Sequence, residues 1–64
     1  MQIRIESRKL PLDEISARIR EHRGTEKTID SFLDACVAAA HELNLTYYFR
    51  VDQVSGWKIV AVFL

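Results

Sequence analysis

The chain has 64 residues with nine basic and nine acidic side chains, so no net charge draws it toward nucleic acid or a membrane. Its length limits it to a single domain, which we expect to span residues 1–64. The only cysteine, Cys36, excludes an intramolecular disulfide and a multi-cysteine zinc site, and it indicates a reducing compartment.

No segment has the composition of a membrane anchor or a signal peptide. The longest uninterrupted apolar run, Ile59 to Leu64, is far shorter than the roughly 20 residues that a membrane-spanning helix needs. The N-terminal segment MQIRIESRKL carries charges where a signal peptide has an apolar stretch. We therefore expect a cytoplasmic protein that makes no membrane contact.

The first third of the chain predicts a strand followed by a helix. In QIRIES, residues 2–7, Ile3 and Ile5 alternate with polar residues, which indicates a short strand with one buried face. Residues 11–24 begin with Pro11, which suits a first helical turn, and end with Gly24, which can adopt a left-handed conformation. This helix offers only a narrow apolar stripe of three large side chains, Leu12, Ile15 and Ile19.

Residues 28–44 give the strongest helical pattern in the chain. Thr28 is a good N-cap, and Asn44 is a plausible left-handed stop. Between them, apolar residues recur at spacings of three and four, with Cys36 at the centre of the stripe: Ile29, Phe32, Leu33, Cys36, Val37, Ala40 and Leu43.

Residues 45–64 predict a β-hairpin. If Val54, Ser55 and Gly56 form a three-residue loop with Gly56 at positive φ, the strand register follows. The predicted pairs are Asp52 with Lys58, Val51 with Ile59, Phe49 with Ala61, and Tyr47 with Phe63. An opposite-charge pair on one face and a large–small pair on the other are typical of a stable register.

The predicted order is therefore β-α-α-β-β in a small α+β domain. We expect two helices packed on one face of a three-stranded, mainly antiparallel sheet, with the C-terminal strand in the centre. This arrangement places one set of apolar residues on an inner face, toward the helices: Ile3, Ile5, Tyr47, Phe49, Val51, Trp57, Ile59, Ala61 and Phe63. The two helices are expected to cover this inner face.

The last strand is apolar on its outer face too, where an antiparallel sheet normally presents polar residues. The outer face would hold five residues that we predict as a partner-binding surface: Tyr48, Arg50, Val60, Val62 and Leu64. Contiguous apolar patches usually mark contact sites. Two alternatives stay open: the valines only favour strand geometry, or the first helix crosses the outer face and makes a three-layer monomer.

No pair of reactive side chains is spaced for catalysis or metal binding. His22 and His41 lie on different predicted helices, and Cys36 is expected to be buried and unreactive. Asp30 and Asp34 are one turn apart, but no cation-binding loop accompanies them. We therefore expect no enzymatic activity, no metal and no cofactor.

These patterns favour a non-enzymatic protein–protein interaction module. Its expected partner is a second copy, giving a homodimer, or a larger protein. By analogy of size it could be a phage- or mobile-element-type inhibitor or a small subunit. The alternative, ranked lower, is a small nucleic-acid-binding regulator that uses an arginine-rich N-terminal segment: Arg4, Arg8, Lys9, Arg20 and Arg23.

Overall fold

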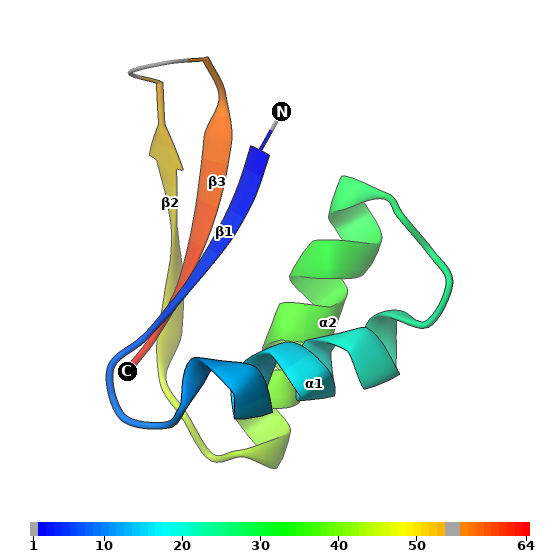
Figure 1. Ribbon diagram of the computed structural model, residues 1–64, viewed down its shortest axis with the longest axis vertical. Coiled ribbons are helices and arrows are strands. Elements are labelled where there is room, and N and C mark those ends of the chain that lie inside the picture. The colour runs from blue at the N-terminus through cyan, green and yellow to red at the C-terminus, as the bar shows by residue number, and fades with distance from the viewer. Residues whose placement is uncertain (1, 54–55) are drawn as a thin grey trace.

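The computed structural model describes residues 2–53 and 56–64 of the chain and contains the five predicted elements in the predicted order. They are β1 (Gln2–Ser7), α1 (Leu12–Arg23), α2 (Ile29–Glu42), β2 (Tyr47–Asp52) and β3 (Lys58–Phe63). Figure 1 shows the sheet on one side and both helices on the other, which confirms the α+β arrangement of two helices on one sheet face.

The three strands form a mixed sheet in the order β1-β3-β2, so the C-terminal strand is central as predicted. β3 runs parallel to β1 and antiparallel to β2. The predicted hairpin register is confirmed at all four pairs, from Asp52–Lys58 to Tyr47–Phe63. Gly56 has the expected positive φ, 97°, whereas Val54 and Ser55 of the predicted loop lie outside the described residues.

The helix ends confirm the capping residues that the sequence predicts. The Thr28 hydroxyl accepts a hydrogen bond from the Ser31 backbone N–H over 3.1 Å, which satisfies one of the unpaired donors at the start of α2. Gly24 and Asn44, which follow α1 and α2, have φ values of 63° and 56°. These left-handed residues end each helix and turn the chain toward the next element.

The core lies between the helices and one end of the sheet. α1 contributes Ile15 and Ile19, and α2 contributes Phe32, Cys36 and three alanines, Ala35, Ala39 and Ala40. The sheet adds only two fully buried residues to this cluster, Ala61 and Phe63 from the second half of β3. The helices therefore cover the end of the sheet at which β1 and β3 finish.

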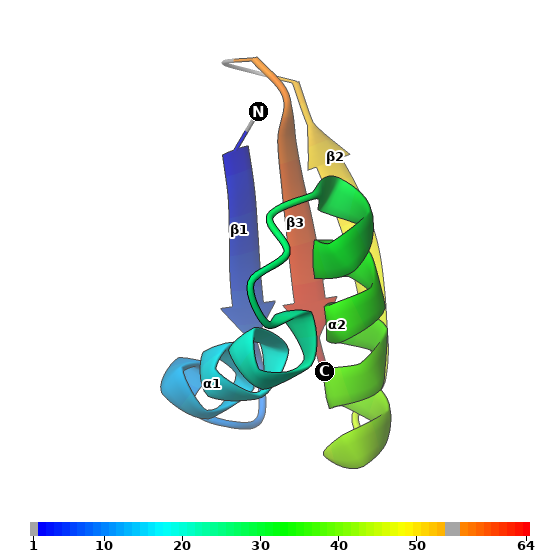
Figure 2. The ribbon, with the colours of Figure 1, turned by 90° about the vertical axis from the view of Figure 1, so that its right-hand side faces the viewer.

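The other end of the sheet extends beyond the helices. In Figures 1 and 2 the β2–β3 hairpin reaches well past the start of α2, while α1 crosses at the opposite end. The next row toward the hairpin, formed by Ile3, Ile59 and Val51, lies outside the core cluster. The two helices of the described residues leave this row partly exposed, with Ile3 at 37% and Val51 at 51%.

The position of Cys36 gives a direct test of the core. Burial raises the pKa of its thiol from 9.0 to about 12, with a smaller opposing effect of the Arg23 charge, so almost no reactive thiolate forms near neutral pH. We expect a chromogenic thiol reagent to leave Cys36 unmodified in the folded protein and to modify it fully in denaturant. In an Asp34→Cys variant the added, exposed thiol should react at once. Equal rates for the two thiols would show that α2 is not packed as described.

Candidate functional site

The outer face of the sheet, which points away from the helices, holds Val60 and Val62 as predicted, but both are 0% exposed. In the sheet register Val60 lies between Arg4 and Arg50, and Val62 lies between Glu6 and Tyr48. The two valines are thus flanked on both sides by long side chains whose aliphatic parts can lie over a small neighbour.

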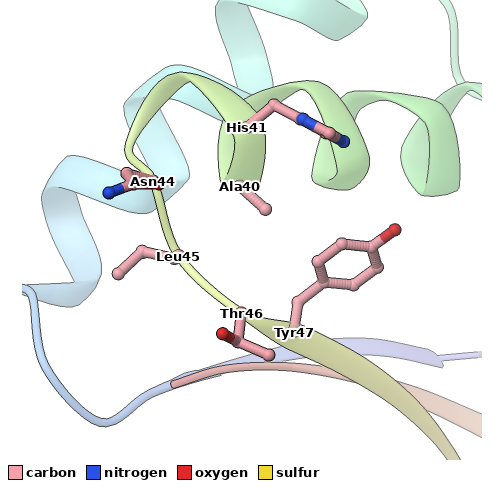
Figure 3. Close-up of a pocket in the computed structure, with 6 residues that line it drawn as sticks. All are labelled: Ala40, His41, Asn44, Leu45, Thr46 and Tyr47. Carbon is pink, nitrogen blue, oxygen red and sulfur yellow. The ribbon is translucent and has the colours of Figure 1, made fainter.

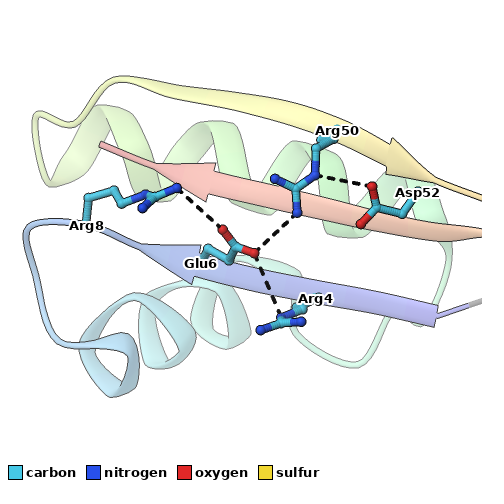
Figure 4. A network of polar contacts seen from close by, with 5 residues as sticks. All are labelled: Arg4, Glu6, Arg8, Arg50 and Asp52. Atoms are coloured by element: carbon cyan, nitrogen blue, oxygen red, sulfur yellow. Dashed lines mark hydrogen bonds and ion pairs between the residues drawn. The ribbon is translucent and has the colours of Figure 1, made fainter. Parts of the chain in front are cut away.

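An ion-pair network closes over these valines. Arg50 on β2 and Glu6 on β1 are separated by β3, yet the Arg50 Nη2 and Glu6 Oε2 atoms are 3.3 Å apart, so their side chains bridge the central strand (Figure 4). The Glu6 carboxylate oxygens also lie 4.0 Å from Arg4 Nε and 3.9 Å from Arg8 Nη2. Arg50 Nε lies 3.3 Å from Asp52 Oδ1. Asp52 and Glu6 together raise the pKa of Arg50.

This finding corrects the exposure that the sequence predicted for part of the outer face. We expected Val60 and Val62 to be an exposed apolar patch, and the expectation is wrong because charged neighbours cover them. The three-layer alternative is also wrong, because α1 lies with α2 on the other face (Figure 1). Of the remaining predicted residues, Tyr48 and Leu64 are exposed and Arg50 is half-buried.

The exposed apolar surface lies instead on the helix side of the sheet, at its hairpin end. Val51 is 51% exposed and Trp57 58%, while Ile3 and Phe49 are each 37% exposed and Ile59 is half-buried. Trp57 precedes β3, and its carbonyl accepts a hydrogen bond from the Gln2 N–H over 3.1 Å, so the strand pairing continues to it and alternation places its side chain with Ile59. We call these five residues the hairpin-end patch. The prediction that the helices cover the whole inner face is wrong at this end.

The two faces of the sheet differ sharply in charge. The strand residues whose side chains lie on the helix side of the sheet are all uncharged. They are Ile3, Ile5 and Ser7 on β1, Tyr47, Phe49 and Val51 on β2, and Ile59, Ala61 and Phe63 on β3. The outer face carries four basic residues, Arg4, Arg8, Arg50 and Lys58, against the two acidic residues Glu6 and Asp52. Since the chain has nine charges of each sign, the rest of the molecule has five basic and seven acidic residues.

The basic residues proposed for nucleic-acid binding do not form one surface. Arg4 and Arg8 lie on the outer face beside Glu6, whereas Arg20 lies on α1 in the helix layer, and Lys9 lies in the connection between β1 and α1. Arg23 is used inside the fold: it donates to the Thr28 carbonyl over 2.9 Å and to the Ser31 hydroxyl over 3.1 Å, and its guanidinium lies 5.6 Å from the centre of the Phe32 ring. It joins the end of α1 to the start of α2.

A second polar cluster joins the second half of α1 to the end of α2. His22 Nε2 lies 2.6 Å from Glu42 Oε2, and Arg18 donates to Glu42 Oε1. The His22 hydrogen bond, followed by the Arg18 charge, lowers the pKa of Glu42. Within the described residues the hydrogen bonds and ion pairs of His22, Arg18 and Glu42 connect the two helices and include no serine, threonine or cysteine side chain.

His41 lines a shallow hollow where α2 meets β2. The hollow has a volume of about 460 Å³ and is lined by Ala40, His41, Asn44, Leu45, Thr46 and Tyr47. Figure 3 shows His41 and the Tyr47 ring on its two sides. His41 is exposed and, within the described residues, its side chain makes no hydrogen bond or ion pair, not even with Tyr47 across the hollow.

Two searches of residues 2–53 and 56–64 give negative findings. No group of three or more histidine, cysteine, aspartate or glutamate side chains is placed to hold a metal ion, and no helix is long and apolar enough to cross a membrane. Comparison with protein-family models, curated proteins and solved structures gives no match for this chain. The most distinctive surface feature of the described residues is the hairpin-end patch.

The cover over the outer valines can be tested at Arg50. Arg50→Ala removes both the charge and the aliphatic stem beside Val60, whereas Arg50→Met removes the charge and keeps most of the apolar volume. We expect the alanine variant to melt at a clearly lower temperature than the methionine variant, in thermal denaturation followed by circular dichroism. If both variants melt alike, the ion pairs, and not the covering stem, would be the important contribution.

The Glu42 cluster predicts a pH-dependent contribution to stability. Since the pKa of Glu42 is lowered on folding, its pairing stabilises the protein above the ordinary value of 4.5 and is lost as the pH falls through the folded value. We expect Glu42→Gln to lower the melting temperature near neutral pH and to match the original protein in strongly acidic solution. Glu26→Gln, at an exposed carboxylate in the connection between the two helices, is the control and should have a much smaller effect. A Glu42→Gln effect that does not depend on pH would contradict the assignment.

Proposed function

We propose that this protein is a non-enzymatic interaction module that binds a protein partner through the hairpin-end patch. The observation that carries the proposal is the exposure of Val51 and Trp57, at 51% and 58%, on a sheet face without charged side chains. An inhibitor or a small subunit of an assembly, the two roles suggested by size, would each use such a surface.

The energetics favour a contact surface over a set of scattered exposed residues. Burying a side chain of this size stabilises a complex by about 1.5–3 kcal/mol, so several adjacent ones can form the apolar centre of an interface. Ile3, Ile59 and Val51 are direct neighbours in the sheet register, and Phe49 and Trp57 adjoin them. Large aromatic residues such as these two are enriched at the centres of protein interfaces.

Other roles have less support in the geometry. The cations of the nucleic-acid alternative are divided between the outer face and the helix layer, and Arg23 is engaged in contacts between the helices. The outer face has Tyr48 as an exposed aromatic residue beside Arg50 and Glu6, but two carboxylates offset its four basic residues. Single-stranded nucleic acid is usually bound where aromatic side chains line a consistently positive groove.

The proposal predicts that patch residues contribute little to folding. At a protein concentration low enough to exclude association, Val51→Thr should change the free energy of unfolding by less than about 0.5 kcal/mol, as exposed sites do. Ile15→Val, an equally small change at a fully buried site, should cost about 0.5–1.5 kcal/mol. Denaturant titration followed by circular dichroism measures both.

The same titration can overturn the proposal. If Val51→Thr destabilises the dilute protein by as much as Ile15→Val or more, the Val51 side chain is needed to hold the monomer together. The patch would then be part of the fold, and its exposure would be no argument for a partner.

A further inference from the structure

We infer that the partner of the hairpin-end patch is a second copy of this chain, bound through the same patch around a two-fold axis. This inference rests on the proposed function and names the occupant of that surface. Most homodimers have this isologous symmetry, in which each residue of the interface meets the same surface on the other copy.

Charge is the first argument for self-association at this face. In an isologous interface a charged patch faces its own copy, so like charges are brought together and oppose binding. The outer face, with four basic and two acidic residues, would be disfavoured for that reason. The helix side of the strands has no charged side chain, so two copies can meet there without repulsion between sheet residues.

The size of the patch is the second argument. The exposed fractions of Ile3, Phe49, Val51 and Trp57 correspond to apolar surface on the order of 300–400 Å². A standard interface buries about 800 Å² per partner, somewhat over half of it apolar, so the patch approaches the apolar centre of one. A dimer with an interface near the lower end of this range should be weak and depend on protein concentration.

The shape of the molecule permits the contact. The hairpin end of the sheet reaches past the start of α2, and α1 lies at the far end (Figures 1 and 2). Two such ends can pack face to face at the spacing of about 10 Å that stacked sheets adopt, with the helices of each copy displaced toward opposite ends. The Ile3–Ile59–Val51 row would then meet its own copy and receive the layer that its own chain does not supply.

Sedimentation at increasing protein concentration tests the inference, with two matched variants. Val51→Lys places a charge in the patch, and Leu12→Lys places the same charge at a residue that is 48% exposed on α1, outside the patch. We expect the original protein and Leu12→Lys to move from monomer to dimer, and Val51→Lys to raise the dimer dissociation constant by at least about tenfold. Trp57→Lys should do the same, and circular dichroism confirms that each variant is folded.

Cross-linking tests the symmetry. Because Cys36 is buried and unreactive, a short bifunctional maleimide should join two copies only through an added thiol. We expect Val51→Cys to give a covalent dimer and Leu12→Cys to give none. Equal yields from the two variants would overturn the patch-to-patch geometry.

The remaining outcomes separate this inference from the proposed function. A monomer at every concentration overturns the second copy as partner, and if Val51→Thr is still neutral for folding, a different protein remains the proposed occupant. A dimer that survives both Val51→Lys and Trp57→Lys also overturns the inference, and it would point to pairing along the edge strand β2.

Discussion

The structure depends on one constraint: the chain has too little helix to cover its sheet. Two helices of 12 and 14 residues must cover a three-stranded sheet, and α1 brings only two fully buried side chains, Ile15 and Ile19. Both helices pack where Ala61 and Phe63 lie, which concentrates the core at one end of the sheet. A domain of this size buries only about 60% of the surface of its unfolded chain, so it cannot bury both faces of a sheet with helices alone.

The outer face is covered in a different way: long charged side chains, and not a helix, lie over the central strand. Val60 and Val62 are flanked by residues of the two edge strands, and the Glu6–Arg50 pair bridges the central strand above them. Exposed ion pairs of this kind contribute at most about 1 kcal/mol each, whereas burying a valine side chain is worth about 1.5 kcal/mol or more. The covering stems therefore matter more than the charges at their ends. A central strand that is apolar on both sides does not by itself require a third layer or a partner.

The sequence predicted the fold well and misplaced the exposed surface, for one physical reason. Strand alternation, the Thr28 and Gly24 helix ends, and the Asp52–Lys58 pair are local signals, and they determined the elements and the hairpin register. Exposure depends on which end of the sheet the helices cover and on which long side chains lie across a strand. Neither of these two arrangements is indicated by a pattern of neighbouring residues in the sequence. Alternation placed Val51 on the helix side, as the register confirms, but it could not show that this residue would remain 51% exposed there. The spacing of Arg50 and Glu6, 44 residues apart in the chain, gave no indication of their contact.

Folding and binding are linked in a molecule built this way. The strand residues on the helix side of the sheet carry no charge along its whole length. At one end this surface packs against the helices in the core, and at the other end it stays exposed as the hairpin-end patch. Strand alternation accounts for the core surface and for the patch alike. Every second residue of β1, β2 and β3 lies on the helix side and is uncharged, both where the helices cover the sheet and beyond them. A partner that covers this end would stabilise the folded state by an amount that grows with the logarithm of its concentration above the dissociation constant, since ligands of the native state shift the folding equilibrium by mass action. The same gain would be a larger share of the small free energy of unfolding of a 64-residue domain than of that of a large one.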